Sequence, residues 1–150
     1  MMNQATHAPF ESTYQTTNAW LKELREELDW QDRHRAYRAL RAVLHALRDR
    51  LTVEETADLG AQLPMLIRGL YYEGWTPSGK PVKERKKEDF LAHIEAAFRD
   101  DPAIFPEAVA RAVFQVLQRH VSAGEIGDVK QILPAQIRAL WPEGEVRRGS

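Results

Sequence analysis

The sequence predicts an all-α fold of about eight helical segments, arranged as two tandem, sequence-related helical halves that share one core. Three observations predict it. Apolar residues recur along the chain with the spacing of helical faces. Two segments begin with a hydroxyl residue followed three positions later by glutamate, which is typical of a helix start. No stretch shows the apolar–polar alternation of a half-buried β-strand.

The chain matches itself when it is shifted by 70 residues, and the match needs no gap. Over residues 20–74, 14 of 55 positions are identical to those in residues 90–144. Many other positions keep their apolar or polar character. A fixed period of self-similarity indicates repeated structural units, so we interpret the chain as an internal duplication.

Each half begins with two amphipathic helices. Apolar residues spaced i, i+1, i+4 and i+8 form one helical face in residues 20–28, and the same spacing recurs in residues 90–98. The second helix has an apolar seam from Tyr37 to Leu51 with steps of three and four residues. Its counterpart covers residues 110–121, and Pro106 suits the first turn of that helix.

The third helix of each half has a start signal of the capping-box type. Thr52 and Glu55 form it in the first half, and Ser122 and Glu125 form it in the second. In this motif the hydroxyl accepts a hydrogen bond from a free backbone N–H, and the glutamate reaches back to the N–H of the cap residue. We therefore expect both glutamates to serve as caps.

A Leu-Pro pair predicts where the third helix ends and the fourth begins. It lies at residues 63–64 and again at 133–134. Proline disfavours helix at the residue before it and favours the first turn of a following helix. Gly74 and Gly144 are suited to stop the fourth helix.

The basic segment between the halves reads as a linker because it combines lysines with proline, serine and glycine. One globular domain is expected overall, because neither half is long enough to bury a comfortable core alone. The predicted organisation is a flexible N-terminal tail (1–13), a first helical repeat (14–75), a basic linker (76–87), a second helical repeat (88–144) and a C-terminal tail (145–150).

Composition limits the classes of function to consider. The 150 residues carry a formal net charge of −1 and include no cysteine, which excludes disulfides and thiolate chemistry. The histidines lack metal-ligand spacing, and no phosphate loop or nucleophile motif occurs. We therefore expect a non-enzymatic protein without metal or cofactor. No apolar run is long enough for a membrane span, so a cytoplasmic location without membrane contact is expected.

The chain resembles a known family in its helical motifs. The stretches YRALRAVLHALRDRLTVEETADLGAQLPMLIRGLYYEGW and GEIGDVKQILPAQIRALWPEG are similar to those of the bacterial domain of unknown function 2267. The resemblance covers roughly residues 14–144. It implies an all-helical, duplicated, cytoplasmic bacterial protein, and it implies no reaction.

Two arginines occupy equivalent positions in the fourth helices, Arg68 and Arg138. One interpretation is a pair of anion-binding groups in a central groove. The other is structural: each arginine binds a carbonyl or an acidic group of its own half, such as Asp58 or Asp128. The structural interpretation is favoured, because both halves must fold by the same rules.

An aromatic rim closes the first half and is the best binding candidate in the sequence. Tyr72 and Trp75 follow the fourth helix beside the linker, and aromatics near arginine are typical of binding hot spots. Trp141 belongs to the rim in the second half, but its position matches Tyr71 and favours burial. Together with the two arginines, these residues form the predicted binding set for a protein partner or a second copy.

Basic residues support nucleic-acid binding as the alternative function. A helical wheel places Arg35, Arg38 and Arg50 on the outward face of the second helix. Phosphate contacts would come from this face and from the linker. The linker residues are Lys83, Arg85, Lys86 and Lys87. The primary prediction remains a protein-binding or self-associating helical module.

Overall fold

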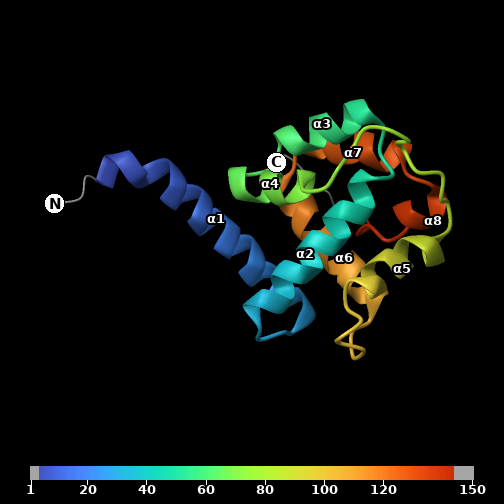
Figure 1. Ribbon diagram of the computed structural model, residues 1–150, viewed down its shortest axis with the longest axis horizontal. Coiled ribbons are helices and arrows are strands. Elements are labelled where there is room, and N and C mark those ends of the chain that lie inside the picture. The colour runs from blue at the N-terminus through green and yellow to red at the C-terminus, as the bar shows by residue number, and fades with distance from the viewer. Residues whose placement is uncertain (1–3, 144–150) are drawn as a thin grey trace.

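Helices account for all the regular structure in the described part of the chain. The computed structural model describes the backbone of residues 4–143 and the side chains of residues 8–143. Within that range there are eight α-helices and no strand, which confirms the all-α prediction (Figure 1). They are α1 (Gln4–Leu28), α2 (Arg33–Arg48), α3 (Val53–Ala61), α4 (Met65–Tyr72), α5 (Lys87–Ala96), α6 (Pro106–His120), α7 (Ala123–Ile132) and α8 (Ala135–Arg138).

The helices of the two halves interlock around one core. α1 packs against α2 of its own half and against α6 of the other half, while α5 packs against both α6 and α2. The helices α2 and α6 are in contact at the centre, and α3 and α7 lie side by side at one end (Figure 1). A single cluster of buried hydrophobic residues therefore includes residues of both halves.

The N-terminal helix is longer than predicted. It begins at Gln4, so residues 4–13, which we expected to form a flexible tail, are helical. The polar composition and Pro9 hide this helix from a periodicity search. Its second half packs on the core, and the contact reaches back to Thr13, whose Oγ1 accepts from the Leu66 N–H at 3.1 Å. The first half projects beyond the rest of the molecule (Figure 1).

The predicted start signals of α3 and α7 are half confirmed. Thr52 Oγ1 accepts from the Glu55 N–H at 3.1 Å, and Ser122 Oγ accepts from the Glu125 N–H at 3.2 Å. No hydrogen bond from a cap N–H to either glutamate side chain forms within residues 8–143. The expectation that the two glutamates act as caps is therefore wrong, because their carboxylates turn toward each other instead.

The Leu-Pro pairs separate helices as predicted. α3 ends at Ala61 and α4 begins directly after Pro64, while α7 ends at Ile132 and α8 begins after Pro134. Gly74 follows the end of α4 with φ +76°, a backbone conformation that glycine adopts without strain. Gly144 and the predicted C-terminal tail lie outside the described residues.

The segment between α4 and α5 is non-helical and is attached to the end of α2. The Val82 N–H donates to the Asp49 carbonyl at 2.8 Å, and Glu84 pairs with Arg50. The predicted linker thus extends to Lys86, and Lys87 opens α5. Across residues 4–143, none of the helices has both the length and the apolar character that crossing a membrane requires.

Candidate functional site

Arg68 and Arg138 bind backbone carbonyls of their own half. Arg68 donates from Nε to the Gly60 carbonyl at 2.9 Å and from Nη2 to the Leu63 carbonyl at 2.8 Å. Arg138 donates in the same way to the carbonyls eight and five residues before it, at 2.7 and 2.8 Å. Neither arginine pairs with Asp58 or its counterpart in the described structure. These contacts favour the structural interpretation, because each guanidinium joins a short helix to the end of the preceding one.

The aromatic rim is folded back on α3. The Tyr72 ring packs edge-on against Tyr71 and Trp75, with centroid distances of 4.9 and 5.9 Å. It occupies the space that a side chain at Gly60 would need, since a Cβ there would lie 2.9 Å from Tyr72 Cζ. Tyr72 and Trp75 are each only partly exposed. Their contacts support the helix packing and leave little aromatic surface for a partner.

Trp141 and Tyr71 are core residues, as their equivalent positions predict. Trp141 is 2% exposed and stacks on Phe114 at a centroid distance of 4.1 Å. Tyr71 is fully buried, and its hydroxyl donates to the Thr56 carbonyl at 2.8 Å. Burial raises the pKa of Tyr71 far above its ordinary value. A partner at the surface would not reach either ring.

The outward arginines of α2 are engaged with the loop that follows α5. Arg35 forms a bidentate pair with Asp101 at 2.6 and 3.2 Å and lies over the Trp30 ring at 4.0 Å. Arg38 pairs with Asp100 at 2.6 Å. The fork geometry of arginine suits such carboxylate pairing. A phosphate backbone would have to displace these carboxylates to bind either arginine.

Only some of the basic residues of the linker form ion pairs. Lys87 pairs with Glu107 at 3.1 Å, which joins the start of α5 to the start of α6. Lys83, Arg85 and Lys86 are exposed and form no ion pair within the described residues. Of the seven basic residues predicted to bind nucleic acid, four form ion pairs, Arg35, Arg38, Arg50 and Lys87, and the other three are solvated.

Arg50 contradicts the helical-wheel prediction. It is 3% exposed, because the linker folds back over the end of α2 and pairs Glu84 with its guanidinium. Its Nη1 also donates to the Ala46 carbonyl at 2.9 Å. Burial lowers the pKa of Arg50, and the neighbouring Glu84 opposes this effect. Arg48 is also buried and donates to the Tyr71 carbonyl at 2.6 Å, which satisfies the end of α4.

A groove with an apolar lining lies between α1, α2 and α4. Its volume is about 470 Å³. Leu21, Leu40 and Ile67 form its buried side. Its exposed rim carries Tyr37, Met65 and Leu66, which are 36%, 53% and 47% exposed. Exposed apolar residues that gather at a concave surface are typical of a binding site.

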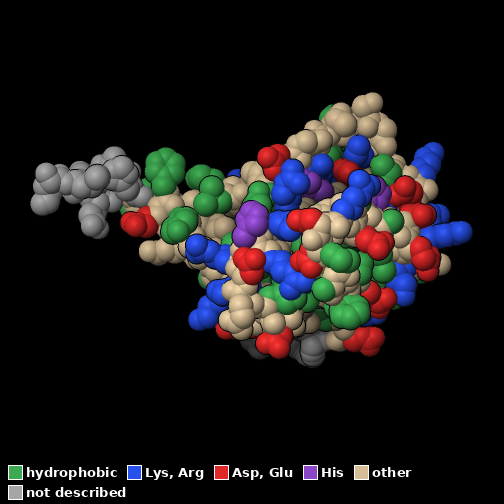
Figure 2. Space-filling view, turned by 60° about the horizontal axis from the view of Figure 1, so that its bottom comes forward, with side chains coloured by type: hydrophobic (Ala, Val, Ile, Leu, Met, Phe, Trp, Pro, Cys, Tyr) green, Lys and Arg blue, Asp and Glu red, His purple; other side chains and the backbone are tan. Residues whose placement is uncertain are grey.

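The groove continues along α1 onto the projecting half of that helix, which we call the arm (residues 4–17). Residues 10, 14, 17 and 21 are spaced by four, three and four, so they share one helical face. Thr17 and Leu21 line the groove, and Phe10 and Tyr14, which are 64% and 54% exposed, lie further along the same face of α1. Hydrophobic side chains are visible along the projecting arm (Figure 2).

This groove and arm were not predicted from the sequence. The signal was present, because the spacing of residues 10, 14, 17 and 21 is helical. It was masked by assigning residues 1–13 to a tail and by starting the first apolar face at Trp20. The rim residues Met65 and Leu66 follow Pro64 directly, and nothing local distinguishes an exposed position there from a buried one.

A cluster of carboxylates between α3 and α7 was also not predicted. Glu55, Asp58 and Glu125 each place one oxygen within 4.8 Å of the others. Glu55 and Glu125 are buried, with 8% and 9% exposure. A Glu-x-x-Asp pattern occurs in both halves and could have indicated the cluster. Helix capping accounted for both glutamates, so no contact between the halves was expected.

The sequence model described as "Uncharacterized conserved protein (DUF2267)" matches residues 17–140. The chain belongs to this family. The resemblance found in its helical motifs is thereby confirmed. No curated protein matches the chain.

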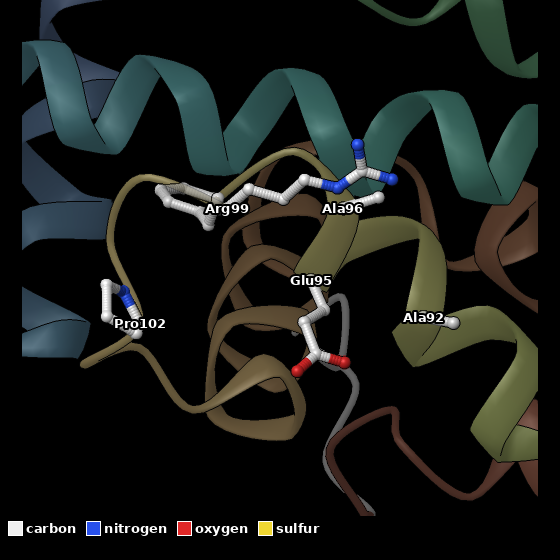
Figure 3. A pocket seen from close by; sticks show the side chains of 6 residues that line it. Ala92, Glu95, Ala96, Arg99 and Pro102 are labelled. Atoms are coloured by element: carbon white, nitrogen blue, oxygen red, sulfur yellow. The ribbon is translucent and has the colours of Figure 1, made fainter.

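A second hollow of this DUF2267 protein lies at the end of α5. It has a volume of about 400 Å³ and is lined by two alanines, Phe98 and Pro102 together with Glu95 and Arg99. The two charged side chains point in different directions, so no pair of groups converges on the space (Figure 3). Catalysis needs acid, base or nucleophile within hydrogen-bond reach of one reacting atom. The apolar groove is therefore the better candidate site.

Proposed function

We propose that this protein is a non-enzymatic, self-associating helical module, in which the α1 arm of one copy docks in the apolar groove of a second copy. The observation that carries the proposal is the continuity between arm and groove. Five of the seven large hydrophobic side chains exposed in the described structure belong to this one surface: Phe10, Tyr14, Tyr37, Met65 and Leu66. Such a concentration is typical of an interface.

A second copy fits the surface because the protein offers both complementary parts on one face. A groove between helices accommodates an amphipathic helix through residues spaced i, i+4 and i+7. The arm carries Phe10 and Tyr14 at the i, i+4 spacing, and both side chains are exposed. Two copies related by a twofold axis would fill both grooves at once, which is the geometry of an isologous dimer.

The charges of the two surfaces also fit. In the groove the single charged residue, Glu73, is paired with Arg41 at 3.1 Å. Within residues 8–17 of the arm, Glu11 is the one charged residue. Neither surface carries the charge that would favour a strongly charged partner. In the separate monomers both surfaces expose apolar area to water. Mutual burial of the two is favourable for this reason.

The oligomeric state of the full chain tests the proposal. Sedimentation equilibrium should show a dimer at a chain concentration of about 100 μM. At that concentration nearly all chains are dimeric if the dimer dissociates with a Kd of about 1 μM. Tyr14→Glu in the arm and Leu66→Glu in the groove should each shift the equilibrium to monomer while helicity stays unchanged. Phe105→Glu is the matched control, because Phe105 is 75% exposed at the start of α6, away from this surface.

Mixing the two variants adds a sharper test. In a mixed dimer the intact arm of Leu66→Glu meets the intact groove of Tyr14→Glu, so one of the two contacts is restored. A mixture should therefore contain dimer although each variant alone is monomeric. A monomeric wild-type chain, or variants that dimerise as the wild type does, would contradict the proposal.

Nucleic-acid binding remains the alternative proposal, and it has narrower support. Lys83, Arg85 and Lys86 are exposed without an ion pair in the described structure, whereas Arg35 and Arg38 are paired with aspartates. Phosphate binding would appear as an affinity that falls steeply with salt and weakens when the three linker residues are neutralised. Fluorescence anisotropy with a labelled duplex and a labelled single strand at low salt would measure it.

We also propose that the two halves descend from one duplicated helical unit. Contacts that recur at a separation of 70 residues support this interpretation. They include the hydroxyl caps at Thr52 and Ser122 and the carbonyl contacts of Arg68 and Arg138. The exchange of packing partners, α1 on α6 and α5 on α2, is what a pseudo-twofold arrangement of such units would produce.

A further inference from the structure

The carboxylate cluster of α3 and α7 lies where the two halves of the molecule meet. The two helices lie side by side (Figure 1). Each has a glutamate as its third residue. Glu55 and Glu125 face each other across the contact, and Asp58 follows Glu55 by one helical turn. One oxygen from each of these three residues lies within 4.8 Å of the other two.

The two glutamates have no basic side chain and no hydrogen-bond donor other than each other to compensate their burial. Glu55 Oε2 and Glu125 Oε2 are closed off from solvent and accept no hydrogen bond within the described residues. The ion pairs of residues 8–143 leave both glutamates and Asp58 without a lysine, arginine or histidine. A buried carboxylate without a partner is costly, so a proton or a cation must compensate it.

The helix dipoles and the nearby hydrogen-bond donors do not compensate the buried negative charge of Glu55 and Glu125. The first turn of each helix carries a partial positive charge, but this charge is small, and the N–H of Glu55 and of Glu125 is already bound to its own cap hydroxyl. Tyr71 of α4 donates its hydroxyl to the Thr56 carbonyl, and Arg48 of α2 donates to carbonyls of α4. Neither group reaches the carboxylates as a hydrogen-bond donor.

The spacing of the oxygens matches that around a single metal ion. Oxygens bound to one Ca²⁺ at about 2.3–2.6 Å lie no more than about 5 Å apart. The three residues offer only carboxylate oxygen, which is the ligand type of hard divalent cations. We propose that Glu55, Asp58 and Glu125 bind one oxygen-preferring divalent cation, such as Ca²⁺ or Mn²⁺, and so join α3 to α7.

Binding of the metal alone to the full-length chain tests the proposal. Protein stripped with a chelator would be titrated with Ca²⁺, Mg²⁺ and Mn²⁺ by calorimetry, and Mn²⁺ binding would be followed by loss of the free-ion signal in electron paramagnetic resonance. We expect saturable binding of one ion per chain and a higher melting temperature with at least one of the three cations, because a ligand that binds only the folded state stabilises it.

Conservative variants locate the site. Glu55→Gln, Glu125→Gln and Asp58→Asn keep the side-chain shape but remove a charge, and each should weaken binding about tenfold or more. Glu54→Gln is the matched control, because Glu54 is an exposed neighbour on α3 outside the cluster. The glutamine variants remove a buried negative charge and should therefore fold without metal. Their melting temperatures in the presence of a chelator verify this.

Two outcomes would overturn the proposal. One is the absence of binding by all three cations, which would leave the glutamates as a pair that shares a proton. The other is binding of undiminished affinity in Glu55→Gln and Glu125→Gln, which would place the ion elsewhere on this acidic surface.

Discussion

Arg68 and Arg138 make the same two hydrogen bonds in the two halves of the molecule. Each guanidinium donates from Nε to the carbonyl eight residues earlier and from Nη2 to the carbonyl five residues earlier. The acceptors include the residue directly before the proline that starts the next helix. The turn between two helices leaves such carbonyls without an intrahelical partner, and the arginine supplies one.

Replacement of either arginine should destabilise the fold by a similar amount. Arg68→Met and Arg138→Met each remove two charge-assisted hydrogen bonds at a partly exposed turn, which we expect to cost about 1–2 kcal/mol. Urea unfolding measures the change. Arg99→Met is the control, because Arg99 is exposed and makes no hydrogen bond within residues 8–143, so it should change stability little. A loss confined to one half would contradict equivalent roles for the two arginines.

The cap hydroxyls of α3 and α7 should contribute equally as well. Thr52→Ala and Ser122→Ala remove the acceptors of the Glu55 and Glu125 N–H groups, and each should cost about 1 kcal/mol of unfolding free energy. Thr52→Ser retains the acceptor and should stay close to the wild type. Thermal unfolding of the three variants would show whether the caps act as local signals. An alanine variant as stable as the wild type would count against them.

Gly60 is expected to be intolerant of a side chain. A Cβ at this position would collide with the Tyr72 ring, which is held between Tyr71 and Trp75. Gly60→Ala should therefore cost about 1–3 kcal/mol through displacement of the ring, although alanine has the higher helix propensity. Gly127→Ala in α7 meets nothing within 4 Å and should stabilise the protein slightly. Equal effects of the two substitutions on the urea midpoint would disprove the clash.

Stability of the metal-free protein should fall as pH rises. Glu125 has a pKa of about 8 in the folded chain against an ordinary value of 4.5, so the folded state binds the extra proton between these values. The stabilisation is complete below about pH 4.5 and is lost as pH rises through about 8. With a chelator present, urea unfolding at about pH 6 and about pH 9 should show this loss, and Glu125→Gln should reduce it. If the difference in unfolding free energy between Glu125→Gln and the wild type is the same at both pH values, the raised pKa of Glu125 is contradicted.

Much of the helical structure was predictable because its signals act over a few residues. The caps at Thr52 and Ser122, the prolines at 64 and 134, and Pro106 at the start of α6 each determine backbone hydrogen bonding within one turn. The burial of Tyr71 and Trp141 followed from their position on an apolar helical face. These predictions required no knowledge of which helices would meet.

The candidate sites depended on contacts that local signals do not encode. Phe10 belongs to a helical segment that was assigned to a flexible tail, and Arg50 is buried because the linker returns over α2. Glu55 carried a sufficient local explanation as a cap, so nothing in the sequence pointed to its neighbour on α7.

The sequence by itself determined the all-helical structure, the junctions at the two Leu-Pro pairs, the cap residues of α3 and α7, and the apolar faces that form the core, since these follow from spacing and from hydrogen bonding along the chain. It did not determine where α1 begins. Only the tertiary structure decided which polar groups would be buried together. Glu55 and Glu125 are 70 residues apart, and they meet because α3 packs on α7. The free energy of that packing comes from the shared hydrophobic core, which brings the two carboxylates together although they repel each other.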